Sequence, residues 1–173
     1  KRIGGYSSVM YEDSEYRMWY VENEYRPDGI YICVKYARSD DGISWETPEL
    51  GIADGYERKP NNVVLGYGAG GITGGTGDGT CMVFLDPLDK RGNKFKMTAR
   101  HGIKEPLGLY ASPDGINWHR ELDTVLDDGR FSGNTGVFHL DSQNIIFWDD
   151  RISRYVAYVR KNYENHGQYR TVA

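Results

Sequence analysis

The chain has 173 residues, with 22 Gly, 14 Tyr, 4 Trp and 5 Phe but only 7 Ala and 9 Leu. Because strong helix formers are scarce while aromatic and β-branched residues are common, this composition predicts a mostly β protein. The scattered 21 Lys and Arg against 25 Asp and Glu give a net charge of −4, which provides no basic field for nucleic acid. Apolar runs such as 81–85 are far shorter than the roughly 20 residues of a membrane-spanning helix. We therefore expect neither nucleic acid nor membrane as a partner.

Residues that bind metals or cofactors form no predicted site. The four histidines are too widely spaced for a zinc site. The glycine-rich stretch 66–79 is followed by no Lys and no helical pattern, so it predicts neither a phosphate-binding loop nor a dinucleotide site. Cys33 and Cys81 are too few for a disulfide framework and lie in apolar runs, which predicts two buried free thiols. No metal or cofactor is expected.

The first strand-like segments are short and separated by polar breaks. Apolar, aromatic and β-branched residues predict strands over 6–11, 16–20 and 30–36. The breaks between them run through Ser14 and begin at Pro27, as expected of turns.

A short motif comes after the third of these strands and occurs twice. Residues 39–45 and 112–118 share the pattern S-x-D-G-I-x-W, 73 positions apart. Asp and Ser side chains bond to nearby backbone amides, Gly supplies a positive φ, and the Trp anchors the start of the next strand. The motif therefore predicts a turn between outer strands, with a fourth strand beginning at Trp45 and at Trp118, and not a catalytic feature.

The strand pattern repeats around this motif. A second copy has predicted strands at 81–85, 95–99 and 107–110, and a third at 144–148, 155–160 and 169–173. A period of this length suits the blade of a β-propeller with long loops. We predict an all-β propeller of which this chain holds two to three four-stranded blades, at about 6–50, 62–122 and 137–173. Because so few blades leave the ring open, we expect a fragment that needs the remaining blades of the same protein or an oligomeric partner.

Several segments together resemble a known superfamily. They are Ser7–Val9, Tyr16–Tyr20, the turn from Ser39 to Trp45, Glu46–Gly51 and Asn61–Leu65. This pattern looks like the five-bladed β-propeller glycoside hydrolases and their bacterial relatives, which include the invertase and levanase type and the arabinanase and xylosidase type. The resemblance implies a five-bladed ring, a carbohydrate substrate and a secreted or periplasmic location. It also implies further blades upstream of Tyr6 and downstream of Ala173.

The resemblance implies a catalytic pair of carboxylates. In these enzymes, acidic side chains on or just before the innermost strands point into a central funnel, where one acts as acid and another as base or nucleophile. Asp78 and Asp141 precede matching strands of the second and third copies and are the candidates. Each also fits a structural role, Asp78 as part of a Gly-Asp-Gly turn and Asp141 as a strand-start cap. The first copy departs from the pattern, because Gly4–Ser7 contains no carboxylate and the Arg-Asp-Pro signature of invertases is absent.

Five further residues are candidates for substrate binding: His139, Gln143, Asn144, Arg100 and Trp19. The first three cluster around Asp141, Arg100 ends a predicted strand, and Trp19 offers an aromatic face for a sugar. The alternatives are a semi-buried role for His139 and a core role for Trp19.

Three functions therefore stay open. The first is a glycoside hydrolase that uses Asp78, Asp141 and an acid outside this chain. The second is a noncatalytic propeller that binds a glycan in the same funnel. The third is a sialidase-like protein, whose S-x-D-x-G-x-T-W boxes are similar to the repeated turn. In this chain, however, Asp and Gly are adjacent, and Arg58, Arg100 and Arg160 form no convincing arginine triad.

Overall fold

A computed structural model describes residues 2–26, 29–52, 61–66, 81–100, 107–123, 125, 143–163 and 167–172. This part of the chain contains strands and no α-helix, which confirms the all-β class. Within it, no helix is long and apolar enough to cross a membrane. The strands are β1 (Arg2–Glu12), β2 (Glu15–Arg26), β3 (Gly29–Ser39), β4 (Val63–Leu65), β5 (Cys81–Leu85), β6 (Phe95–Arg100), β7 (Leu107–Ser112), β8 (His119–Leu122), β9 (Ile145–Asp149), β10 (Arg154–Tyr163) and β11 (Gly167–Val172).

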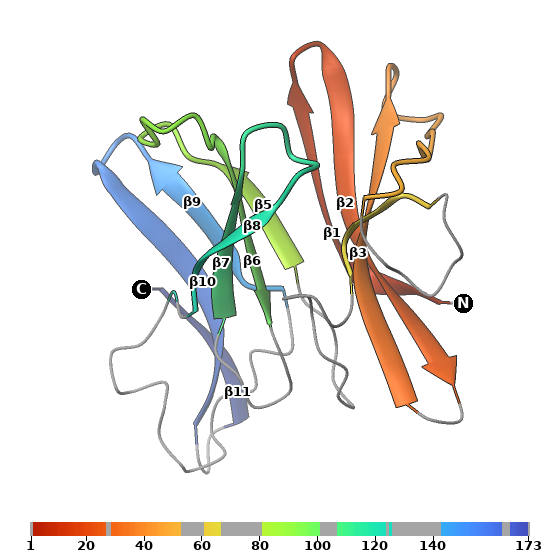
Figure 1. The fold of residues 1–173 in the computed structure, drawn as a ribbon. Helices are drawn as coiled ribbons and strands as arrows, with labels where there is room; N and C mark the ends of the chain where they lie inside the picture. The colour runs from red at the N-terminus through yellow and green to blue at the C-terminus, as the bar shows by residue number, and fades with distance from the viewer. Residues whose placement is uncertain are drawn as a thin grey trace.

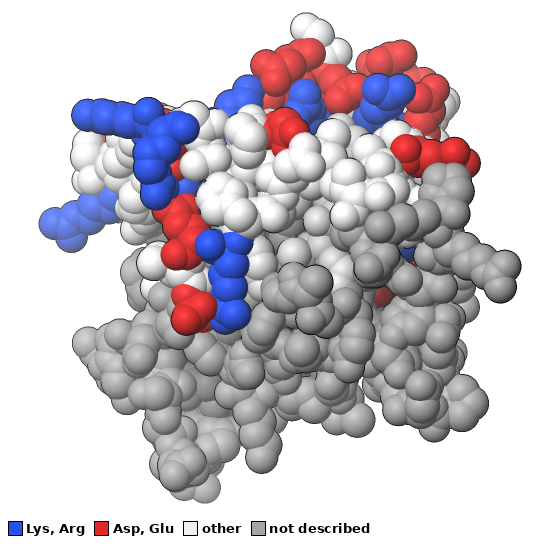
Figure 2. All heavy atoms as spheres, in the orientation of Figure 1, with Lys and Arg blue, Asp and Glu red and all other residues white. Residues whose placement is uncertain are grey.

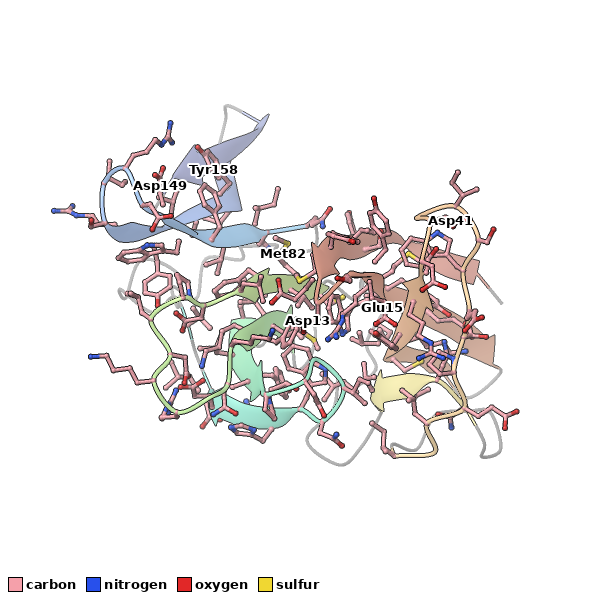
Figure 3. All side chains as sticks on the ribbon, turned by 90° about the horizontal axis from the view of Figure 1, so that it is seen from above. Asp13, Glu15, Asp41, Met82, Asp149 and Tyr158 are labelled. Atoms are coloured by element: carbon pink, nitrogen blue, oxygen red, sulfur yellow. The ribbon has the colours of Figure 1, made fainter. Side chains whose placement is uncertain are left out.

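The strands form three antiparallel sheets, each made from consecutive strands. The first sheet has the order β1-β2-β3-β4, the second β5-β6-β7-β8 and the third β9-β10-β11. Strand β5 contacts β1 and β2 on one side and β9 on the other. Figure 1 shows β1, β5 and β9 running in the same general direction, and Figure 3 shows the three sheets spreading outward from the place where these strands meet.

The second sheet is buried on both faces. Val83 and Phe84 are neighbours in β5, and they belong to different core clusters because successive side chains of a strand point to opposite faces. The larger cluster packs the first sheet on the second and contains Trp19, Val21, Val34, Tyr36, Val83, Phe95, Met97 and Tyr110, among others. The smaller cluster packs the second sheet on the third and contains Phe84, Leu107, Ile146, Ala157 and Val159.

The repeated motif forms the same turn twice. In the first copy, the Ser39 hydroxyl accepts a hydrogen bond from the Gly42 amide at 2.9 Å. Asp41 Oδ1 accepts bonds from the next two amides at 2.8 and 2.7 Å. Ser112 and Asp114 make the equivalent bonds in the second copy, with distances of 2.8 Å to each amide. The prediction of a turn motif is confirmed.

The second copy of the turn also joins two sheets. The Trp19 indole N–H donates to the Gly115 carbonyl at 2.6 Å, and Arg17 donates to the Asp114 carbonyl at 3.0 Å. Gly115 has a φ of 77°, and a Cβ there would lie 2.7 Å from Trp19 Cζ2. This turn therefore requires glycine both for its backbone conformation and for its contact with β2.

The fourth strand of the first sheet differs from the prediction. After Trp45, only Glu46 forms an isolated bridge, to Arg38, whereas β4 supplies the fourth strand through the pairs Val34↔Leu65 and Lys35↔Val63. Pro48 has no N–H for a ladder bond, and the three residues of β4 are buried. Residues 63–65 therefore belong to the first sheet and not to the start of the second repeat. In the second sheet, β8 begins directly after Trp118, close to the predicted place.

Both cysteines are buried and neither forms a disulfide, as predicted. Cys81 begins β5, and its burial raises the pKa of its thiol to about 12.

Candidate functional site

One group of contacts joins the middle of β1, the start of β5 and the segment just before β9. The Ser8 hydroxyl of β1 accepts a hydrogen bond from the Val83 amide at 2.9 Å and contacts Met82 Sδ at 3.5 Å. From the segment before β9, the Gln143 amide donates to the Ser7 carbonyl at 2.9 Å and reaches Met82 Sδ at 4.0 Å. We call Ser7, Ser8, Met82 and Gln143 the axial cluster. Figure 3 shows Met82 between the three sheets.

Gln143 and Asn144 are described by the structure, and they differ in accessibility. Gln143 is half-buried and belongs to the axial cluster, so it lies near the place where a funnel was predicted. Asn144 is only 2% exposed. A ligand can therefore meet the Gln143 side chain, whereas the Asn144 side chain is part of the interior.

The expectation that Trp19 stacks on a sugar needs correction. Its side chain is 0% exposed, and its ring lies 5.6 Å from the Tyr36 ring and 5.8 Å from the Phe95 ring. Because the Trp19 side chain lies on the face of β2 that packs against the second sheet, core side chains cover its ring on both sides. Trp19 therefore supports the contact between the first and second sheets.

The remaining predicted site residues are not placed by the structure. Asp78, His139 and Asp141 lie outside the described residues, and only the backbone of Arg100 is described, at the end of β6. Asp78 precedes β5 in the sequence and Asp141 precedes β9, as predicted. Their role as a carboxylate pair stays a prediction.

Among the described residues, no three His, Cys, Asp or Glu side chains are grouped so that they could hold a metal ion. Charged side chains of both signs lie next to one another along the upper margin of the described surface in Figure 2. This part of the surface therefore has no single-sign field that would attract an ionic polymer.

A second group of polar residues lies at the opposite end of β5. The Lys96 ammonium is 2.6 Å from Asp89 Oδ2 and 2.7 Å from Glu121 Oε2, and the Lys96 and Asp89 side chains are only 3% and 1% exposed. Arg91 binds Asp89 at 2.8 Å and also binds Glu121. Asp86 lies 3.9 Å from Lys96. We call these five residues the charged cluster.

The charges of the cluster stabilise one another. Burial alone would lower the pKa of Lys96, but hydrogen bonds to Asp89 and Glu121 outweigh it, so the pKa is raised. Hydrogen bonds from Lys96 and Arg91 hold the pKa of Asp89 below its usual range. Lys96 is therefore a cation and Asp89 an anion throughout the neutral range.

The charged cluster was not predicted from the sequence. Residues 86–93 have the composition of an ordinary turn, and Glu121 is far from them in the sequence. The alternation of Phe95, Lys96 and Met97 is typical of a strand with one face in solvent, and only the structure shows that Lys96 is covered. A lysine on a covered face needs a carboxylate partner.

Comparisons of the chain with protein-family models, with curated proteins and with solved structures found no significant match. The resemblance to the propeller hydrolases therefore depends on the residues and motifs described above.

Proposed function

We propose that the chain is part of a β-propeller that acts on carbohydrate by acid and base hydrolysis of a glycosidic bond. The observation that carries this proposal is the axial cluster, where the first strands of three consecutive antiparallel sheets meet. Radial sheets whose first strands line a common axis are the architecture of propellers, and loops entering the first strands surround the axis at one end.

Chain connectivity relates the candidate carboxylates to this end. Asp78 is three residues before Cys81, and Asp141 is four residues before Ile145. Each therefore belongs, in the sequence, to the loop that enters the first strand of its sheet. Because β5 contacts β9, two carboxylates in one funnel are compatible with the pair that glycoside cleavage requires.

In the proposed mechanism, one carboxyl group protonates the leaving oxygen, while the other stays ionised as base or nucleophile. Two neighbouring carboxylates take these different roles when their surroundings separate their pKa values. The Gln143 side chain lies beside this end of β9 and is the described residue best placed to hold a sugar hydroxyl.

A glycan-binding protein without catalysis is the second candidate. No Asp or Glu occurs among residues 1–11, and the first carboxylate, Glu12, lies at the far end of β1. The first sheet therefore supplies no acid at the end where the other two would, and this absence favours binding without turnover.

The two candidates are separated by assaying the full chain against arabino-, xylo-, fructo- and galacto-configured glycosides. Hydrolysis is expected to fall by at least about 100-fold in Asp141→Asn and in Asp78→Asn. Asp123→Asn, which changes an 86% exposed carboxylate beside Arg120, serves as the control and should keep full activity. Binding without turnover supports the second candidate. If the chain neither binds nor hydrolyses any of these glycosides, the proposal is contradicted.

A further inference from the structure

A cavity of about 610 Å³ lies between the second and third sheets, beside the charged cluster. Its lining runs from Phe84, in the second half of β5, into the turn after this strand, whereas the proposed funnel lies before Cys81, the first residue of β5. None of the described residues that line the cavity belongs to the axial cluster, so a ligand of this cavity is independent of the proposed glycoside chemistry. Its volume is within the range of pockets that hold small organic molecules.

The floor of the cavity is apolar and comes from both sheets. Its lining includes Phe84, Leu109, Ile146 and Ala157. Two large apolar side chains that remain accessible, Leu88 (49% exposed) and Tyr155 (46% exposed), also line it. This lining favours a ligand with a rigid apolar body.

Among the residues that the structure describes, the charges around the cavity balance. The carboxylates of Asp86, Asp89 and Glu121 line it together with the cations of Lys90, Arg91 and Lys96. Asp89 and Glu121 are already paired with Lys96 and Arg91. A charged ligand would have to compete with these pairs, so the balance favours a neutral one.

One carboxylate oxygen has capacity for a ligand. Asp86 Oδ1 accepts hydrogen bonds from the Leu88 amide at 2.9 Å and from the Tyr155 hydroxyl at 2.6 Å. Asp86 Oδ2 lies 3.9 Å from the Lys96 ammonium, which is beyond hydrogen-bond distance. This oxygen can accept a hydrogen bond from a hydroxyl group at the end of the apolar floor.

We infer that this cavity binds a neutral small molecule with an aromatic or alicyclic body and one hydroxyl group, which donates to Asp86 Oδ2. A sugar ring carries many hydroxyl groups and would leave most of them unpaired against the apolar floor. The ligand class is therefore phenols and cyclic alcohols rather than glycans.

Calorimetric titration of the full chain with three probes of similar shape tests the inference. 4-Phenylphenol has the hydroxyl donor, 4-methoxybiphenyl lacks it, and biphenyl-4-carboxylate carries a charge. We expect saturable binding of 4-phenylphenol. The methyl ether should bind about tenfold or more weakly, which is the effect of one hydrogen bond to a charged group. The carboxylate should also bind more weakly, because its charge must compete with the ion pairs of the cluster. Equal affinity for the phenol and its methyl ether, or no saturable binding of the phenol, would overturn the inference.

Two pairs of variants locate the binding. Leu88→Ser should weaken 4-phenylphenol binding by several-fold, whereas Ile43→Ser, a comparable loss of an aliphatic side chain at an 83% exposed position in the turn after β3, should not. Asp86→Asn should reduce the preference for the phenol over the methyl ether, whereas Asp13→Asn, which also comes after a first strand, should leave it intact. Equal effects within either pair would place the probe elsewhere. Because the proposed function assigns Asp141 to the funnel, Asp141→Asn should leave probe binding unchanged whether or not it abolishes hydrolysis.

Discussion

At the scale of the residue, Gly115 occupies a position where a side chain would be strained and would clash. Its φ of 77° and the 2.7 Å that would separate a Cβ from Trp19 Cζ2 both oppose any side chain. We expect Gly115→Ala to lower the free energy of unfolding by about 2–4 kcal/mol, the sum of left-handed strain and overpacking. Gly92→Ala is the matched control, because Gly92 has a φ of 88° with open space around it, and it should lose only about 1–2 kcal/mol. Urea denaturation of both variants measures the difference, and equal losses would show that the Trp19 contact contributes nothing.

Lys96 and Arg91 both bind Asp89 and Glu121, but the Lys96 side chain is buried and the Arg91 side chain is exposed. Lys96→Met leaves Asp89, which is 1% exposed, with only an exposed partner, and we expect a loss of about 3 kcal/mol. Arg91→Met removes a side chain that is 62% exposed, and it should cost clearly less, because an exposed ion pair contributes little to stability. Thermal or urea unfolding of the two variants compares them. A loss for Lys96→Met no larger than that for Arg91→Met would contradict a buried role for the Lys96 charge.

At the scale of the element, the repeated turn makes the free energy of unfolding depend on pH in the acidic range. Hydrogen bonds from the Ser44 and Ile43 amides, and then from Ser39, lower the pKa of Asp41 from 3.8 to about 2. A carboxyl group with a lowered folded pKa contributes stability above its unfolded pKa, and this contribution is lost as the pH falls from about 4 to about 2. Asp41→Asn keeps an oxygen acceptor without the titration, so its unfolding midpoint in urea should vary less with pH over this window. Asp40→Asn, one residue away, should keep the pH dependence of the parent chain.

The strands and turns also show which features could be predicted from the sequence. Strands with clear turns at both ends, such as β5 and β9, were predicted within about a residue of their bounds. The turn motif was predicted because its chemistry is local, with each bond spanning two or three residues. Strand β4 was assigned to the wrong repeat because its three residues have no local signal and gain their place by pairing with β3. The charged cluster was missed for a similar reason, since Glu121 meets Lys96 only after β8 has paired with β7. The catalytic role of Asp78 and Asp141 was predicted by resemblance and stays a prediction.

At the scale of the whole molecule, the rate at which the Cys81 thiol is alkylated reports whether the first and second sheets stay packed together. Cys81 is 1% exposed within the core cluster that joins these sheets, and burial raises its pKa to about 12. At pH 8 the thiol is therefore protonated as well as covered, and alkylation requires the sheets to separate. We expect iodoacetamide to label Cys81 in a Cys33→Ala variant at a rate that rises with urea in parallel with the unfolded fraction. Gly115→Ala, which weakens the same contact, should raise this rate in the absence of urea, whereas Gly92→Ala should raise it less. Labelling of the folded chain as fast as that of a thiol in an unstructured peptide would mean that the two sheets do not stay packed in solution.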